Sequence, residues 1–398
     1  METEAKALID ALFTAPGKVF LSGEYSVTYG SDTNPAIAFT IDKRTQCHVK
    51  VFKREEGFPF LDIECKFFKI VLEQYEQLED ISQLETAEIG ALTTFIEAVK
   101  ESGTDLKEFT EKYFITIEMK YAFPSGIGLG SSASYNVALA AAINTVARKL
   151  SNGSFKDMTD IAFTDVEDQW RIRTIADIGE KEAHKSISGA ESAVISLGGI
   201  YKYSRNMTEA SEVIEASAGL HLSEDFKFDL IDTGIHRTPK DSLDDMVTMH
   251  QQYPEIFLYT EESEGVKKKY SNESNIKIFN AVMEAICCTT NSIEALLKEA
   301  TYDSDHLSHL VNTNHRLLES IKAGAEIIDE IVVLANRHKV GAKIVGAGFG
   351  GCMIAIYNTN SQVQEFKDAV NALSEKGVCF IPANFSKLGI QCESWEHR

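Results

Sequence analysis

The order of hydrophobic and polar residues along the chain predicts alternating strands and helices. Near the N-terminus, residues 13–29 and 40–52 are rich in β-branched and aromatic residues, as strands are. The first stretch is broken by Pro16-Gly17 and again by Gly23, and the Ser-Asp and Asn-Pro pairs within residues 31–39 predict a loop between the two stretches. The chain therefore begins with a β-rich region.

The remainder of the chain carries longer helical patterns and a few short apolar strands. The helical patterns cover residues 85–102, 131–150, 157–183, 275–299 and 304–323. Strands are predicted at 113–121, 193–203 and 226–234, and residues 343–357 read as strand, glycine turn and strand. Because 398 residues exceed the usual length of one compact domain, we expect two domains, residues 1–228 and 229–398, that meet at a cleft.

Composition and charge narrow the classes of partner. With 60 acidic and 39 basic residues, the formal net charge of −21 repels duplex nucleic acid and anionic membranes. The seven cysteines form an odd set without a CxxC pair, which indicates reduced thiols and a cytoplasmic protein. There is neither a secretory signal pattern nor an apolar stretch of membrane-spanning length.

The segment PSGIGLGSSAS, residues 124–134, is the strongest chemical signal. Gly126, Gly128 and Gly130 let the backbone approach an anion closely. The predicted helix that follows presents unpaired N–H groups and the positive end of its dipole to that anion. One of the hydroxyls of Ser131 and Ser132 can reach a Mg²⁺ ion, as the corresponding residue of a P-loop does. These features predict a phosphate site.

The segment is not a Walker P-loop, because it has no GKS or GKT at its end. Two other interpretations stay open. Gly128-x-Gly130-x-x-Ala133 formally matches the looser dinucleotide fingerprint, but the second strand with an acidic end is missing about 20 residues later. A glycine turn that only packs a helix on a strand is the other alternative.

Three further stretches carry candidate polar groups. In residues 15–30, Lys18 can present a fixed positive charge, and Glu24 follows closely. In residues 179–201, Glu180 and Glu191 can supply a metal-binding and a catalytic carboxylate. Each of these four residues, taken alone, also fits an ordinary surface position. The glycines of residues 346–351 can close over a bound phosphate or simply bend a hairpin.

Taken in order, the four stretches resemble the signature regions of the GHMP kinases, and within that family they are most similar to the mevalonate kinases. The resemblance runs from about residue 13 to residue 357. It implies an α+β, two-domain GHMP kinase fold with a ribosomal-protein-like N-terminal domain and a ferredoxin-like C-terminal domain. The active site is then expected between the two domains.

The resemblance also assigns roles to individual residues. Lys18 and Glu191 match the catalytic pair, and Ser132 and Glu180 match the Mg²⁺ ligands. The ATP-binding positions implied are Pro124, Gly126, Gly128, Leu129, Gly130, Ser131, Ser132 and Ala133. The substrate-binding positions implied are Lys18, Glu24, His184, Arg237 and Gly348.

The chain departs from the family pattern at five positions near these residues. Glu191 stands where an aspartate is usual, Ile187 replaces a proline, Lys185 a glycine, Pro239 a threonine and Tyr25 a histidine. Since a misplacement of about 1 Å can cost roughly 100-fold in rate, the longer Glu191 side chain predicts a slow enzyme. Alternatively, loss of the proline lets the loop retreat and restores the geometry.

The resemblance therefore implies ATP- and Mg²⁺-dependent phosphorylation of mevalonate to 5-phosphomevalonate, in isoprenoid precursor synthesis. Another small-molecule kinase of the family, a related decarboxylase, and a catalytically weak nucleotide-binding regulator are the alternatives. The resemblance also implies a homodimer and inhibition by prenyl diphosphates. No nucleic acid or membrane partner is expected.

Overall fold

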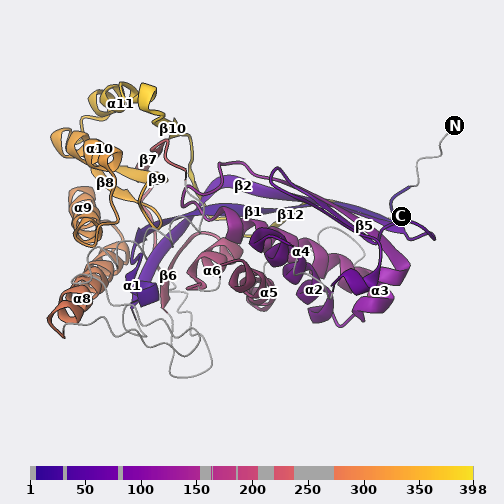
Figure 1. Ribbon diagram of the computed structural model, residues 1–398. Coiled ribbons are helices and arrows are strands. Elements are labelled where there is room, and N and C mark those ends of the chain that lie inside the picture. The colour runs from indigo at the N-terminus through magenta and orange to yellow at the C-terminus, as the bar shows by residue number, and fades with distance from the viewer. Residues whose placement is uncertain are drawn as a thin grey trace.

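The computed structural model describes residues 6–29, 34–78, 84–152, 163, 165–184, 187–204, 219–236 and 273–397, which form two sheets with helices packed against them (Figure 1). The strands of the first sheet are β1 (Ile9–Ser22), β2 (Pro35–Lys53), β3 (Leu61–Glu64), β4 (Lys69–Leu72), β5 (Tyr113–Lys120), β6 (Ile200–Ser204), β11 (Phe385–Ser386) and β12 (Gln391–His397). Those of the second are β7 (Lys227–Asp232), β8 (Gly341–Ile344), β9 (Cys352–Tyr357) and β10 (Cys379–Ile381).

The helices fall into two groups along the chain. Those before β7 are α1 (Ser26–Tyr29), α2 (Thr86–Glu101), α3 (Leu106–Lys112), α4 (Ser131–Asn152), α5 (Val166–His184) and α6 (Ala190–Leu197), with the short 3₁₀ helix η1 (Tyr75–Leu78). Those after it are α8 (Glu273–Leu297), α9 (Ser304–Ser320), α10 (Glu326–Arg337) and α11 (Val363–Asn371), with η3 (Ser374–Lys376). Within the described ranges, no helix is both long and apolar enough to cross a bilayer.

The first sheet has the order β12-β1-β2-β5-β3-β4, with β6 and β11 also paired to β2. Its pairs are antiparallel except β3 with β5. Strand β1 keeps pairing with β2 through Pro16, where the register shifts from Arg44 opposite Pro16 to Ile41 opposite Gly17. This bulge lets one continuous strand carry Lys18 onward to a position opposite Thr40.

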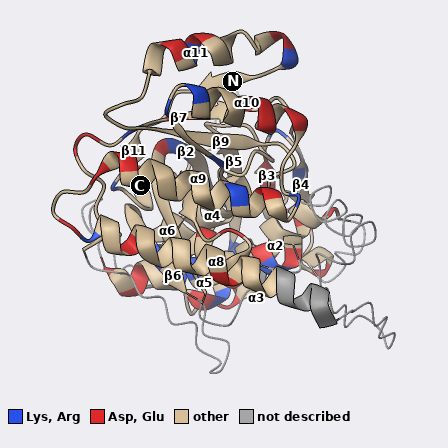
Figure 2. Cartoon of the chain, turned by 90° about the vertical axis from the view of Figure 1, so that its left-hand side faces the viewer, with Lys and Arg blue, Asp and Glu red and all other residues tan. Residues whose placement is uncertain are grey.

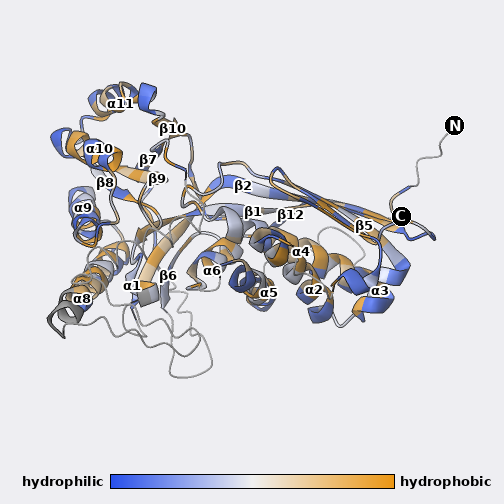
Figure 3. Cartoon of the chain, in the orientation of Figure 1, coloured by the Kyte–Doolittle hydropathy of each residue, from blue (hydrophilic) through white to orange (hydrophobic). Residues whose placement is uncertain are grey.

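Helices α2, α4, α5 and α6 cover one face of the first sheet (Figure 1). The middle of α4 is a run of alanines, Ala140 to Ala142, that is fully buried. The small side chains let α4 approach the sheet closely, and alanine has a high helix propensity. Figure 3 shows the hydrophobic character of the strands and of α4, in contrast to the more polar α3.

The second sheet has the order β10-β7-β9-β8, with all pairs antiparallel. Helices α8 to α11 lie beside this sheet, at the other end of the molecule from α3 (Figure 1). Figure 2 looks onto this end and shows acidic positions interleaved with basic ones over the helices, as the composition requires.

A buried polar network joins β1 to the helices and strands of the second half. The Ser22 hydroxyl hydrogen-bonds with that of Thr290 on α8 at 2.7 Å and donates to Asn314 Oδ1 on α9 at 2.9 Å. Just beyond β1, Glu24 pairs with Lys343 of β8. Lys343 Nζ also donates to the Phe20 carbonyl at 3.2 Å. All these side chains except that of Phe20, which contributes its backbone, are less than 5% exposed.

Most predicted elements are confirmed, including the helices at 85–102 and 131–150, the strands at 113–121 and 226–234, and the strand–turn–strand of 343–357. The helix predicted at 157–183 is confirmed from Val166, while residues 157–162 and 164 lie outside the described residues. The division at residue 228 stays a prediction. The last strands, β11 and β12, join the first sheet.

Four predictions about elements are wrong. Residues 26–29 were predicted as the end of a strand, but they form the short helix α1 beyond the turn at Gly23. Residues 193–197 were predicted as strand but belong to helix α6, because a short apolar run suits either element. The loop predicted for 31–39 ends earlier, since β2 begins at Pro35, where a strand's first residue tolerates proline. The break predicted at Pro16-Gly17 is a bulge within β1.

Candidate functional site

The glycine-rich loop ends at the N-terminus of α4. Ile127 and Leu129 are each 1% exposed and anchor the loop in the core, while Gly126 and Gly128 stay partly accessible and Gly130 is buried. Gly130 has φ +74°, and the Ser134 N–H bonds to the Gly130 carbonyl at 2.8 Å, which opens the helix. The loop thus offers its backbone and the positive end of α4 to an anion.

Lys18 lies directly against this loop. Its side chain is fully buried, and its Nζ donates to the Gly128 carbonyl at 2.9 Å. Its own N–H donates to the Leu129 carbonyl at 2.9 Å. A Cβ on Gly130 would lie 3.0 Å from Lys18 Cγ, so only glycine lets the loop and the lysine pack at this distance.

Glu191 completes the contact with Lys18. It is the second residue of α6, and its Oε1 lies 2.5 Å from Lys18 Nζ. The Lys18 side chain is 0% exposed and that of Glu191 is 37% exposed, so the carboxylate is the member of the pair that a small molecule can reach. A paired lysine and carboxylate can orient a hydroxyl group that lies beside them.

Glu180 lies on α5 and is almost fully buried. One of its carboxylate oxygens, Oε1, accepts hydrogen bonds from Ser132 Oγ and Asn136 Nδ2, both at 2.5 Å. Burial raises the pKa of Glu180 to about 7, and the negative charge of Glu191 adds to this rise. A bound cation would offset this cost of burying the carboxylate.

His184 lies beside Ser132 and Glu180. Its Nε2 lies 3.0 Å from Ser132 Oγ and 3.7 Å from Glu180 Oε2. Since the Ser132 proton goes to Glu180, the serine oxygen accepts from Nε2–H of His184. Burial lowers the pKa of His184, and the nearby Glu191 acts in the opposite direction.

Ser132 and Glu180 have the chemistry of magnesium ligands. Both offer oxygen atoms, which Mg²⁺ prefers. Ser132 lies in the first turn of α4, where the loop would hold phosphate, and Glu180 contacts it from α5. Within the described residues, no group of three histidine, cysteine or acidic side chains is arranged to hold a metal. Magnesium commonly takes only one or two protein ligands and completes its shell with phosphate and water, so the donor set fits.

The second glycine turn lies next to the first. A Cβ on Gly128 would lie 3.4 Å from Gly346 Cα, and the Cys352 N–H donates to the Ile127 carbonyl at 2.8 Å. Gly348 lies further along this turn, against the Ala323 carbonyl, and the Tyr25 hydroxyl donates to the neighbouring Ala347 carbonyl. Gly348 is therefore in the loop that flanks the candidate phosphate site.

The other candidate residues lie in different places. Glu24 belongs to the buried network with Lys343 and is separate from the contacts of Lys18 with Glu191. Pro124 is exposed at the start of the glycine loop, and Ala133 is fully buried in α4. Arg237 lies outside the described residues, as do Lys185 and Pro239.

Sequence reasoning missed Asn136 and Lys343. Asn136 lies four residues after Ser132 on α4, so helical spacing places the two side chains on one face, and this signal was available. Lys343 is fully buried beside Glu24, but nothing local distinguishes it from a surface lysine at a strand end.

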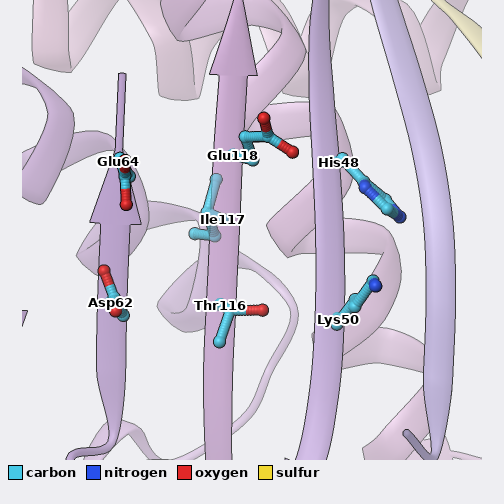
Figure 4. A pocket seen from close by; sticks show the side chains of 7 residues that line it. All are labelled: His48, Lys50, Asp62, Glu64, Thr116, Ile117 and Glu118. Atoms are coloured by element: carbon cyan, nitrogen blue, oxygen red, sulfur yellow. The ribbon is translucent and has the colours of Figure 1, made fainter. Parts of the chain in front are cut away.

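A separate shallow hollow lies on the outer face of the first sheet. Figure 4 shows the side chains that line it: His48 and Lys50 from β2, Asp62 and Glu64 from β3, and Thr116, Ile117 and Glu118 from β5. None of the candidate site residues lines this hollow, and its charges already have partners, such as Asp10 for His48 at 2.6 Å. It is an ordinary polar sheet face.

Comparison with known families decides the relationship. The family model described as the GHMP kinases N terminal domain matches residues 91–199, and that described as GHMP kinases C terminal matches residues 293–376. The two matches occur in the family's order and include α4, Glu180 and Glu191 in the first and the second glycine turn in the other. The chain belongs to the GHMP kinases.

Named relatives of this GHMP kinase agree with that placement. A mevalonate kinase from Thermococcus sibiricus is 26% identical over 391 residues, which cover 96% of this chain and 98% of the relative. Among solved structures, L. major mevalonate kinase in complex with R-mevalonate matches with a TM-score of 0.60 at 19% identity, covering 98% of both chains.

A galactokinase has the same fold. The Lactococcus lactis galactokinase complexed with galactose matches this GHMP kinase with a TM-score of 0.66 at 16% identity, covering 96% of this chain and 95% of that one. These structural likenesses confirm the two-domain α+β GHMP kinase fold that the sequence predicts. The choice of acceptor depends on the side chains of the site.

Proposed function

We propose that this GHMP kinase transfers the γ-phosphoryl group of ATP to the primary hydroxyl of mevalonate and releases 5-phosphomevalonate and ADP. The observation that carries the proposal is the contact of Lys18 with both Glu191 and the glycine loop. It sets a lysine–carboxylate pair beside a backbone cradle for phosphate. Phosphoryl transfer needs these two features next to each other, because its catalysis is mostly positioning and charge stabilisation.

The nucleotide side of the site is supplied by α4 and the loop before it. The backbone N–H groups of residues 126–131 and the α4 dipole would hold the triphosphate. Ser132 and Glu180 would hold Mg²⁺, which neutralises charge on the phosphates when bound. His184 supports this arrangement, since it holds Ser132 by a 3.0 Å hydrogen bond.

The acceptor side is supplied by Lys18 and Glu191. In the proposed step the substrate hydroxyl gives its proton to the Glu191 carboxylate while its oxygen bonds to the γ-phosphorus and the bond to ADP breaks. Lys18 holds Glu191 in place at 2.5 Å and contributes positive charge beside the transferring group. Because Lys18 is fully buried, its position is fixed before the substrate arrives.

The choice of mevalonate rests on the named relatives, which include mevalonate kinases from Candida albicans and Homo sapiens. We assign Arg237 to the substrate carboxylate, since a guanidinium binds a carboxylate through two parallel hydrogen bonds. Glu24 and Gly348 remain candidates for the substrate side. A cytoplasmic location, a homodimer and inhibition by prenyl diphosphates are further predictions from the family resemblance.

The test is a coupled assay for ADP with ATP, Mg²⁺ and mevalonate, beside phosphomevalonate, galactose and homoserine as acceptors. We expect saturable turnover with mevalonate, and its loss when Mg²⁺ is chelated. Turnover with galactose and none with mevalonate would reject mevalonate as the substrate but not the kinase activity. Galactose is included because a galactokinase shares this fold.

A nucleotide-binding regulator is the second candidate, favoured by Glu191 in the place of the usual aspartate. It predicts ATP binding by calorimetry without phosphoryl transfer to any acceptor. The close contact of Lys18 with Glu191 weighs against it, because the longer side chain reaches the lysine. Release of CO₂ in the same assay would instead reveal a decarboxylase.

A further inference from the structure

Three buried polar side chains surround the turn that precedes Glu191. At Gly189, φ is +76°, and a Cβ there would lie 2.6 Å from Arg173 Nη2, 3.0 Å from the Tyr203 hydroxyl and 3.4 Å from Asp177 Oδ2. A side chain at this position is therefore excluded both by conformation and by space. The turn packs on these three groups directly through its backbone.

The three groups are themselves fixed. Tyr203, on β6, is 1% exposed, and its hydroxyl donates to the Ser188 carbonyl at 2.5 Å. Arg173 Nη2 and Asp177 Oδ2 lie 2.7 Å apart on successive turns of α5, and both residues are at most 6% exposed. Arg173 also lies 5.3 Å from the Trp170 ring centre. A buried ion pair and a buried phenol are rigid supports, since moving either leaves a polar group without its partner.

The position of this turn sets the position of Glu191. The Gly189 carbonyl accepts from Ala193 N–H at 3.2 Å, and Ser188 Oγ accepts from Ala190 N–H at 3.3 Å, so α6 starts from these two residues. Glu191 is the second residue of the helix, and its carboxylate ends at Lys18 Nζ on β1. A shift of the Ser188 carbonyl therefore moves the carboxylate.

We propose that Tyr203, supported by the Arg173–Asp177 pair, is a positioning residue. It holds the Ser188–Gly189 turn, and with it the start of α6, in the position from which the Glu191 carboxylate meets Lys18 at 2.5 Å. This assignment rests on the proposed function in so far as Glu191 acts on the acceptor hydroxyl.

The first experiment measures kinetics of Y203F, which removes the hydroxyl and keeps the ring. We expect kcat to fall roughly 10-fold or more while KM for ATP stays unchanged, because a small misplacement affects the reacting groups and not the nucleotide cradle. The matched control is Y201F, which removes a hydroxyl two residues earlier on the same strand and leaves the Ser188 contact intact. It should keep wild-type kcat.

The second arm combines these changes with E191D. If Tyr203 sets the reach, the shorter aspartate costs much in the wild-type background and less in Y203F, where the turn is free to move forward. Additive effects of Y203F and E191D on kcat would overturn the assignment, because a merely structural role adds independently.

A third measurement does not need activity. The coupling between Lys18 and Glu191 is obtained from urea unfolding of K18M, E191Q and the double variant, in the wild-type and Y203F backgrounds. We expect the coupling to shrink or vanish in Y203F and to persist in Y201F. Unchanged coupling in Y203F overturns the positioning role. Absence of turnover on every acceptor, with the coupling behaving as expected, rejects the proposed function alone.

Discussion

Among single residues, Glu191 is the proposed proton acceptor, and its contact with Lys18 fixes its position. Its carboxylate contacts a fully buried lysine, while the side chain of Glu191 remains 37% exposed. We expect E191Q to lower kcat by at least about 100-fold, since general-base catalysis contributes roughly 10²–10⁴-fold. Steady-state kinetics on mevalonate checks this, and full turnover by E191Q would remove Glu191 from the mechanism.

The burial of His315 lets us predict how the stability of the protein changes in acid. Burial lowers the pKa of His315 to about 4 from 6.5, and the cations Lys343 and Arg316 act in the same direction. The carboxylate of Glu319 lies 3.5 Å away but is half-exposed, so burial dominates. The unfolded chain therefore takes up a proton near pH 6.5, whereas the folded protein takes it up only near pH 4.

Stability should accordingly fall as the pH is lowered from 6.5 to 4, by up to about 3 kcal/mol from this residue. Urea unfolding of the wild type and of H315Q at several pH values measures it. H315Q should lose less stability over the same range. Parallel curves for the two proteins would show that His315 titrates alike in both states.

The candidate site was predictable from sequence where short motifs carry the chemistry. Lys18, Ser132 and Glu180 all occupy recognisable stretches, and the structure brings each into contact with another candidate residue. Asn136, which donates to Glu180, was missed although its spacing from Ser132 places both side chains on one helix face. Tyr203, which donates to the Ser188 carbonyl, was missed because this contact joins distant segments and no local pattern shows it.

At the scale of elements, long periodic helices were predicted well and short apolar runs were not. The stretch Ala193–Leu197 reads as a strand, yet it belongs to the two-turn helix Ala190–Leu197, which Gly189 precedes and Gly198 follows. The helical conformation matters for function, because Glu191 lies in the first turn of this helix. Tertiary packing, not local preference, decides such segments.

From the buried polar network between β1, α8, α9 and β8 we predict an effect on stability. Lys343 is fully buried and pairs with Glu24, so K343M leaves a buried carboxylate without its partner. We expect a loss of about 3–5 kcal/mol in the free energy of unfolding. Urea denaturation followed by circular dichroism measures this loss.

The control for K343M is K376M, which breaks an exposed pair with Glu330. This change should cost less than about 1 kcal/mol, as surface ion pairs usually do. The double variant E24M/K343M removes both charges and should recover part of the stability. Equal losses for K343M and K376M would mean that the buried pair does not join the two halves.

At the scale of the whole molecule, the C-terminal strand closes the first sheet. Strand β12 pairs with β1 from Ile9 to Thr14, and Trp395 contacts the Phe13 ring edge to face at 6.3 Å. Sequence patterns could not predict this pairing, because it joins residues almost 390 positions apart. Deletion of residues 391–398 exposes the edge of β1, which is the strand that carries Lys18.

We therefore expect the shortened chain to aggregate or to unfold at lower temperature, although it keeps every candidate catalytic residue. Soluble yield and thermal unfolding measure the effect, with a chain that lacks only Arg398 as the control. Wild-type stability of the shortened chain would show that β12 is dispensable for the sheet.

The complete burial of Lys18 also has a consequence for chemical labelling. An amine-acylating reagent can attack Lys18 only during excursions that separate it from Glu191 and the glycine loop, whereas Lys100, whose side chain is 55% exposed, is always accessible. Mass spectrometry of a brief labelling pulse should find Lys100 modified long before Lys18. The rate of labelling at Lys18 then measures how often this lysine separates from Glu191 and the glycine loop.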